Sequence, residues 1–155
     1  IDQDPHIRIA RGIANRFKYY NFMPISATYH LFASGLRGDG KMSSSDPNSY
    51  IAMTDSPKEV EEKIKKYAFS GGKDTLKEHR EKGGNPDIDI AFQYLKFFFE
   101  PDDKKLREIE AKYRSGEMLT SELKQIAIEK INKFLAEHQR KRKSAKKQID
   151  KFLFK

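Results

Sequence analysis

The sequence predicts a mostly α-helical fold, with a mixed front portion up to residue 54 and a helical back portion after it. Helix-capping signals and apolar residues at helical spacing recur throughout the back portion. The front portion shows one helical pattern, short mixed apolar runs, and a glycine- and serine-rich stretch at residues 38–50 (GDGKMSSSDPNSY). The chain has 155 residues, of which 37% are hydrophobic and 35% charged. This is enough for one good-sized domain or for two small pieces that share a core.

The front portion begins with a helical pattern. Asp4 is suited to an N-cap position and Pro5 to the first helical position. The apolar residues that follow fall on one helical face: Ile7, Ala10, Ile13, Ala14 and Phe17. Residues 25–32 are then predicted to form a short strand that leads into a loop.

The back portion is predicted as a series of helices separated by glycines and capping residues. Ser56-Pro57-Lys58-Glu59 matches a capping box with proline at the first helical position, and Gly71 and Gly72 end that helix. Asp74 is predicted to cap a short helix over residues 75–82, and Asp102 to cap one that ends near residues 115–116. The segment 88–100 is so apolar and aromatic that we expect it to be largely buried.

The last and longest helix is predicted to begin with Thr120 as its cap. Its apolar stripe consists of Leu123, Ile126, Ala127, Ile131, Phe134, Leu135 and His138. The aromatic residues of the preceding segment lie at helical spacing, so they are expected in the core and not as base-stacking platforms: Phe92, Tyr94, Phe97, Phe98 and Phe99.

Charge is concentrated at the C-terminal end. The formal net charge is +8, and residues 139–155 hold eight Lys or Arg against one acidic residue. Such clustering is typical of contact with nucleic acid or another anionic surface, but a solvated helix face explains it equally well. There is no cysteine, and the four histidines show no metal-ligand spacing, so no metal site is predicted. No apolar run approaches the length of a membrane span. The first residue, Ile1, suggests a piece of a longer chain.

Composition alone leaves two interpretations of residues 38–50. Backbone N–H groups and serine hydroxyls can bind oxyanions, and a lysine supplies a compact positive charge, as a phosphate-handling loop requires. The spacing differs from that of a Walker A loop. An ordinary surface loop is the other interpretation.

Four segments resemble one enzyme family. KMSSS at residues 41–45 is similar to the Lys-Met-Ser-Lys-Ser signature of class I aminoacyl-tRNA synthetases. Together with IDQDP at 1–5, AFSGGKDT at 68–75 and GEMLTSELK at 116–124, it resembles the C-terminal part of the archaeal or eukaryotic-type tryptophanyl-tRNA synthetases. The resemblance extends from residue 1 to about residue 142. The related tyrosyl enzymes also carry the lysine-methionine-serine loop, but IDQDP and FSGG are closer to the tryptophanyl pattern.

The resemblance implies a fold and a reaction. Residues 1–54 would be the end of a class I, Rossmann-like α/β catalytic domain, and residues 55–155 an all-helical anticodon-binding domain with a basic C-terminal helix. Tryptophan would attack the α-phosphate of ATP, with Mg²⁺ as counter-ion, and the aminoacyl group would pass to tRNA(Trp). The His-Ile-Gly-His type signature of the family is absent from these residues, so the chain alone is not expected to aminoacylate.

The resemblance also assigns roles to residues of the loop. Lys41 would steady the departing pyrophosphate, the Met42 backbone would contact adenine, and Ser43, Ser44 and Ser45 would hold phosphate oxygens. Ser44 stands where the family signature has a second lysine, which places more of the phosphate charge on Lys41, Mg²⁺ and groups outside this chain.

Further residues are assigned outside the loop. Asp2 would lie by the ATP ribose and Gln3 by the tryptophan ammonium or carboxylate, although both can simply support the first helix. Lys73, Asp74 and Lys124 would contact the anticodon, whose unpaired bases can be splayed out. A helix stop and a helix cap would also explain the first two of these.

The implied partners are tRNA(Trp), tryptophan and ATP, in a cytoplasmic homodimer without membrane contact. Two other functions remain open. A free-standing helical RNA-binding module without catalysis would explain the charge but not IDQDP or KMSSS. A helical protein-interaction domain with a solvated basic tail would explain the helices alone.

Overall fold

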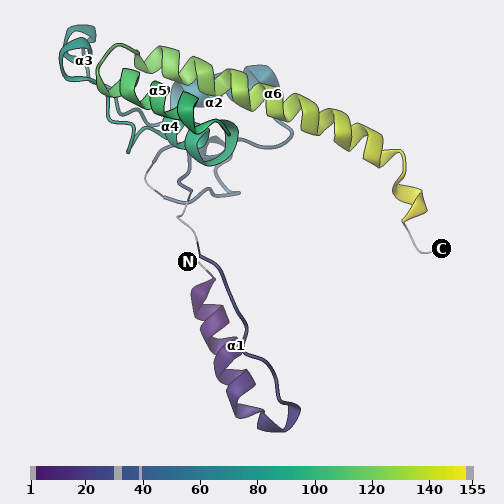
Figure 1. Ribbon diagram of the computed structural model, residues 1–155. Coiled ribbons are helices and arrows are strands. Elements are labelled where there is room, and N and C mark those ends of the chain that lie inside the picture. The colour runs from purple at the N-terminus through teal and green to yellow at the C-terminus, as the bar shows by residue number, and fades with distance from the viewer. Residues whose placement is uncertain (1–2, 30–32, 39, 153–155) are drawn as a thin grey trace. The chain divides into compact units, whose positions relative to one another are not determined.

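The computed structural model describes residues 3–29, 33–38 and 40–152, and the protein is mostly helical, at 61% (Figure 1). Over these described residues there is no strand, only an isolated antiparallel bridge between Ser34 and Lys41. The chain divides into two compact units, residues 1–33 and 34–155. The prediction of a mostly helical fold is confirmed.

The first unit is a helix with an irregular segment running back along it. Helix α1 (Asp4–Arg16) is followed by the short 3₁₀ turn η1 (Lys18–Tyr20). Tyr29 donates its hydroxyl hydrogen bond to Asp4 at 2.6 Å, and Arg11 Nε donates to the Ile25 carbonyl at 2.7 Å. The predicted strand is not formed at residues 25–29, and residues 30–32 lie outside the described residues. The segment that returns along α1 is thus held by the side chains of Asp4 and Arg11, and not by pairing with another strand.

The N-terminus of α1 differs from the predicted cap. Gln3 is the N-cap residue, and its carbonyl accepts hydrogen bonds from the amides of His6 and Ile7, both at 3.1 Å. Asp4 is the first helical residue, where its carboxylate pairs with Arg8 at 2.6 Å and suits the positive end of the helix dipole. No residue of α1 is buried, and large apolar side chains such as Ile9, Ile13 and Phe17 are at least half exposed.

The second unit is built around one long helix, α6 (Thr120–Lys146), which packs against α2 (Pro57–Tyr67), α4 (Ile90–Tyr94) and the π-helical turn η3 (Leu95–Phe99). Helices α3 (Leu76–Lys82) and α5 (Asp103–Arg114) complete it, with two 3₁₀ turns, η2 (Pro47–Ser49) and η4 (Ile149–Lys151). The core is formed by residues from all parts of the unit, including Leu36, Val60, Ile64, Ile90, Leu95, Tyr113, Leu123, Ile131 and Leu135.

Leu36 connects the segment before the lysine loop to the helices of the second unit. Its side chain is fully buried in the core of the second unit, and its carbonyl accepts a hydrogen bond from Phe69 at 2.8 Å. The buried Leu36 side chain and its backbone contact therefore attach this segment to the core of the second unit.

Within the second unit, two of the predicted helix caps are confirmed and two are displaced by one residue. Ser56 forms the full capping box with Glu59, and Asp102 caps α5 through the amides of Lys104 and Lys105. Thr75, and not Asp74, caps α3, and α6 begins after Leu119, whose amide donates to Glu122 at 2.6 Å. Thr120 does not act as the cap because its hydroxyl lies 3.0 Å from the Tyr113 hydroxyl.

The aromatic run is only partly buried. Phe92 and Tyr94 belong to the core as predicted, whereas Phe97 is 39% and Phe98 54% exposed. The helix changes to π-helical geometry at Leu95, so the side chains that follow no longer keep the register of α4. The expectation that all these aromatics are core residues is therefore wrong for Phe97 and Phe98. On α6 the predicted stripe is confirmed at Leu123, Ala127, Ile131 and Leu135, but Phe134 is 46% exposed.

A buried carboxylate joins three segments of the second unit. Asp89 has no exposed surface and accepts hydrogen bonds from the amides of Ala91 and Phe92, which caps α4. Its other oxygen accepts from the Gly71 amide and from the Tyr113 hydroxyl, both at 2.8 Å. Burial raises the pKa of Tyr113, so this hydroxyl stays a neutral donor. The charge of Asp89 is thus balanced by four hydrogen bonds, as a buried carboxylate requires.

The C-terminal ends of α3 and α5 meet at a corner lined with glycine. Gly83 and Gly116 have positive φ angles, of 68° and 78°. A Cβ atom at Gly83 would lie 1.7 Å from the Arg114 carbonyl oxygen, and one at Gly116 would lie 2.3 Å from that of His79. Arg80 donates to the carbonyls of Gly116 and Glu117, which places a cation where two helix ends carry partial negative charge.

We expect Asp89→Asn to lower the free energy of unfolding by about 2–4 kcal/mol, because an amide nitrogen would face groups that themselves donate. Urea denaturation followed by circular dichroism measures this. Asp87→Asn is the matched control: Asp87 is exposed and pairs with Arg114 at 3.0 Å, so its loss should cost less than about 1 kcal/mol. Equal effects of the two substitutions would contradict the central role of Asp89.

Candidate functional site

The lysine-containing loop is closed at its base by backbone contacts. The Gly35 amide donates to the Gly40 carbonyl at 2.7 Å, next to the bridge between Ser34 and Lys41. Gly38 turns the chain with a φ angle of 78°, in the left-handed region that glycine adopts without strain. The loop therefore begins and ends at fixed points on the second unit.

Ser49 organises the serine-rich part of the loop from within. Its hydroxyl accepts a hydrogen bond from the Ser43 amide at 2.9 Å and lies 2.7 Å from the Asp46 carbonyl. Its own carbonyl accepts from the Leu36 amide at 2.8 Å, which ties the loop to the core. Arg37 pairs with Asp46 at 3.0 Å across the loop. The loop is thus a folded structure with an internal hydrogen-bond network.

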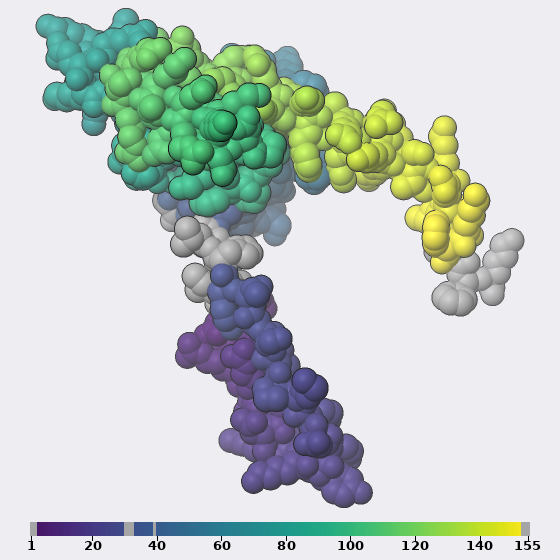
Figure 2. Space-filling view, viewed as in Figure 1, coloured from purple at the N-terminus to yellow at the C-terminus, as the bar shows by residue number. Residues whose placement is uncertain are grey.

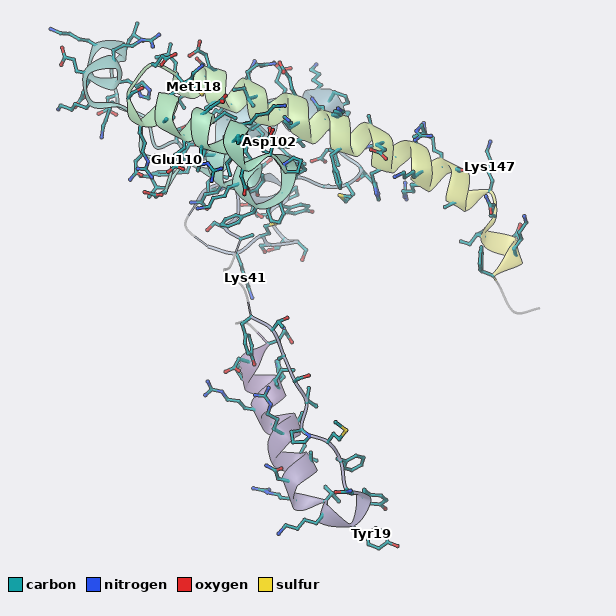
Figure 3. The ribbon with its side chains drawn as sticks, viewed as in Figure 1. Tyr19, Lys41, Asp102, Glu110, Met118 and Lys147 are labelled. Atoms are coloured by element: carbon teal, nitrogen blue, oxygen red, sulfur yellow. The ribbon has the colours of Figure 1, made fainter. Side chains whose placement is uncertain are left out.

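The side chains assigned to phosphate binding lie at the loop surface. Lys41 is exposed and projects from the second unit (Figure 3). The hydroxyls of Ser43 and Ser45 lie 2.8 Å apart, and Ser44 between them is exposed. An ammonium group and adjacent hydroxyls can bind phosphate oxygens. On binding, the hydroxyls would exchange the hydrogen bond between them for hydrogen bonds to the ligand. The Ser43 amide, by contrast, already has Ser49 as its acceptor.

Met42 borders an apolar pocket of about 320 Å³. Its walls include Met53, Tyr94, Phe98 and Phe134, so two of the exposed aromatic residues of the second unit, Phe98 and Phe134, lie beside the loop. Burial raises the pKa of Tyr94 to about 12, so its hydroxyl is neutral at physiological pH. The pocket offers an apolar surface beside Met42, the residue that follows the loop lysine in the sequence.

Lys73 and Asp74 lie on an exposed turn just before α3. Behind this turn is His79, which is buried. The Lys73 amide donates to His79 Nδ1 at 3.4 Å, and His79 Nε2 therefore carries the proton that it donates to the Met118 carbonyl at 2.9 Å. Both side chains of the turn remain exposed while its backbone is held by the core.

Lys124 is half buried and turned toward the protein. Its ammonium group donates to the carbonyls of Ala68 at 2.9 Å and Lys65 at 3.3 Å, at the C-terminal end of α2. Burial lowers the pKa of Lys124, and the nearby carboxylate of Asp89 partly opposes this shift. A cation at a helix C-terminus stabilises that helix. This contact gives Lys124 a structural role in addition to any role in binding.

The predicted site residues do not form one cluster. Lys41 and the turn before α3 lie well apart on the second unit (Figures 1 and 3). Gln3 belongs to the first unit, where it is exposed at the N-terminus of α1, and Asp2 lies outside the described residues. The second unit therefore presents two separate surfaces, one with the lysine loop and one with Lys73 and Asp74.

Several residues that shape these surfaces were missed in the sequence. Ser49 closes the loop, His79 holds the turn, and Tyr113 and Thr120 connect that turn to Asp89. Each acts through a partner at least six residues away, so no local pattern reveals it. The described residues contain no group of three or more His, Cys, Asp or Glu arranged to hold a metal ion. Nor does any helix in the part described have the length and apolar character needed to cross a membrane.

Comparison with known proteins agrees with the arrangement of the loop and helices. The sequence model described as tRNA synthetases class I (W and Y) matches residues 1–136. The tryptophan–tRNA ligase of Sulfurisphaera tokodaii is 55% identical over 155 residues, which is 99% of this chain and 40% of that protein. The corresponding ligase of Pyrococcus furiosus is 46% identical over 154 residues, again 40% of its length.

A solved structure shows the same fold. The crystal structure of tryptophanyl-tRNA synthetase from Aeropyrum pernix K1 matches with a TM-score of 0.89 and 39% identity, covering 94% of this chain and 40% of that one. The chain thus spans about 40% of the length of the curated relatives that it matches. By sequence and fold, it belongs to the family of class I tRNA synthetases of the tryptophan and tyrosine type.

Proposed function

We propose that the intact protein is a tryptophan–tRNA ligase, acting as a cytoplasmic homodimer, and that this chain supplies its lysine loop and its anticodon-binding helices. The observation that carries the proposal is the exposed Lys41 on a serine loop closed by Ser49, in a chain 55% identical to a tryptophan–tRNA ligase. The substrates are tryptophan, ATP with Mg²⁺, and tRNA(Trp).

In the proposed reaction, the tryptophan carboxylate attacks the α-phosphate of ATP and pyrophosphate departs. Lys41 stabilises the negative charge that develops on the leaving group, and Ser43, Ser44 and Ser45 orient the phosphate oxygens. The Met42 backbone contacts adenine beside the apolar pocket. Asp2 and Gln3 contact the ribose and the tryptophan α-groups. A hydroxyl of the tRNA terminal adenosine then takes the aminoacyl group from the adenylate and releases AMP.

Recognition of the tRNA is assigned to the second surface. Lys73 can donate to base edges and Asp74 can accept from a cytosine amino group. His79 and Asp89 support this assignment, because they fix the backbone of the turn and leave both side chains exposed. A preorganised turn loses little conformational entropy when it binds an unpaired loop of RNA.

We expect Lys41→Ala in the intact protein to slow adenylate formation by a factor of about 100 or more, because the leaving group loses its cation. Tryptophan affinity should stay nearly unchanged. Tryptophan-dependent ATP–pyrophosphate exchange measures the first quantity, and Lys58→Ala, an exposed lysine on α2, is the control. A loss of about tenfold or less would show that the loop takes no direct part in the chemistry.

We expect the double substitution Lys73→Ala/Asp74→Ala to reduce discrimination between cognate and altered-anticodon transcripts by about tenfold or more, because each lost base contact contributes about 1–3 kcal/mol. Adenylate formation should not change. Lys77→Ala, on the exposed surface of α3, provides the control for a general loss of charge. Unchanged discrimination would remove this turn from the proposed anticodon site.

Lys124 is tested separately because its ammonium group already has two acceptors. We expect Lys124→Met to lower the free energy of unfolding by about 1–3 kcal/mol, since the end of α2 loses a charged donor. The proposed contact with the anticodon also requires transcript discrimination to fall. Lower stability with unchanged discrimination would assign Lys124 to the support of α2 alone.

A further inference from the structure

The C-terminal third of α6 extends beyond the core. Leu135 is the last buried residue of the helix, and Gln139, four residues later, donates hydrogen bonds to the carbonyls of Met53 and Asp55. Residues 140–147 (RKRKSAKK) are all exposed and continue as a single protruding helix (Figures 1 and 2). This segment also lies beyond the residues that the family model matches.

The positive charge of this segment is concentrated and largely unneutralised. Arg140, Lys143 and Lys147 follow at intervals of three and four, so they share one helix face. Within the described residues from 140 to 152, the ion pair that forms is Lys141 with Glu137, at 2.6 Å. Like charges at this spacing destabilise a helix, and no tertiary contact compensates them here. An anionic ligand would relieve the repulsion.

The segment has no apolar face. Ala145 is the one apolar residue in the stretch RKRKSAKK, so residues 140–147 have no hydrophobic side of their own to insert into a bilayer surface. The exposed apolar residues Ile149 and Phe152 follow after the end of α6, so a membrane surface is included as an alternative partner in the test. Positions that would continue the buried stripe of Leu135, such as Arg142 and Lys146, are basic instead. A hydrophilic polyanion with regularly spaced charges is the partner that fits.

We propose that residues 140–147 form a second RNA contact, which binds phosphates of the tRNA backbone without reading its sequence. The inference rests on the proposed function for the identity of the RNA. Helix α6 has 27 residues, so its basic end lies on the order of 30 Å from its start. The start, at Thr120, lies near the turn that holds Lys73 and Asp74. One tRNA held by its anticodon at the start of α6 can therefore present its stem phosphates to the other end.

The test compares the intact protein with its Arg140→Gln/Lys143→Gln/Lys147→Gln variant by fluorescence anisotropy, with a tRNA(Trp) transcript and an altered-anticodon transcript over a range of salt concentrations. The slope of the logarithm of affinity against the logarithm of salt concentration should become shallower by about 2–3, because three phosphate contacts are lost. Affinity at low salt should fall on the order of tenfold or more for both transcripts equally. Their ratio should not change.

Two control variants separate local contact from general charge. Lys58→Gln/Lys104→Gln/Arg107→Gln removes the same charge from exposed positions on α2 and α5 and should shift the slope by less than about 1. The charge-preserving Arg140→Lys/Lys143→Arg/Lys147→Arg should bind as the unchanged chain does. Circular dichroism verifies that each variant is folded. Equal slopes for the two glutamine triples would overturn the proposal.

The outcomes also separate this proposal from the proposed function. If the chain fails to discriminate between transcripts, yet the two glutamine triples still differ in slope, the anticodon site fails and the phosphate contact stands. If discrimination is present and the slopes do not differ, the basic helix is only a solvated surface. Binding to phosphatidylserine vesicles that depends on Arg140, Lys143 and Lys147, with RNA affinity unaffected, would assign the segment to membranes and overturn the proposal.

Discussion

The second unit depends on how the charge of Asp89 is held inside the protein. A carboxylate with no exposed surface is costly unless its oxygens are fully hydrogen-bonded. Gly71, Tyr113 and the first amides of α4 meet this demand, so three segments that are far apart in the sequence must converge on one side chain. The same convergence places the turn with Lys73 and Asp74 two residues from Gly71. The exposed turn assigned to RNA binding is therefore connected through Gly71 to the buried hydrogen bonds of Asp89.

The lysine loop is also held in shape by hydrogen bonds to one side chain, that of Ser49. Ser49 satisfies the Ser43 amide and contacts the Asp46 carbonyl, while Leu36 attaches the loop to the core. A short stretch of glycine and serine thus gains a defined shape without burying apolar surface of its own. The Lys41 side chain and the residues Ser44 and Ser45 are exposed at its surface, and ammonium and hydroxyl groups are able to bind a phosphate ligand. The preorganisation comes from residues on both sides of the motif.

The sequence predicts correctly those helix caps that depend only on residues close in the chain. The capping box at Ser56 and the cap at Asp102 were predictable, because each involves amides within three residues. Thr120 was misassigned as a cap because its hydroxyl is used by Tyr113, a tertiary partner that no helical pattern includes. Lys124 was recognised from its motif, but its contacts with the end of α2 depend on packing between two helices. Phe97 and Phe98 escaped burial because a π-helical turn changed the register that the prediction assumed. Residues of the loop were identified by family resemblance, which carries information that composition alone lacks.

The corner where α3 and α5 end fixes the lengths of both helices. Gly83 and Gly116 each face a carbonyl of the other segment at a distance that leaves no space for a carbon atom. One residue inserted into either helix would rotate its last turn by about 100° and separate the two glycines from the backbone they face. Divergence of this chain can therefore proceed by substitution along the exposed sides of α3 and α5, but not by insertion or deletion within them. Any lengthening has to be absorbed in turns outside the two helices.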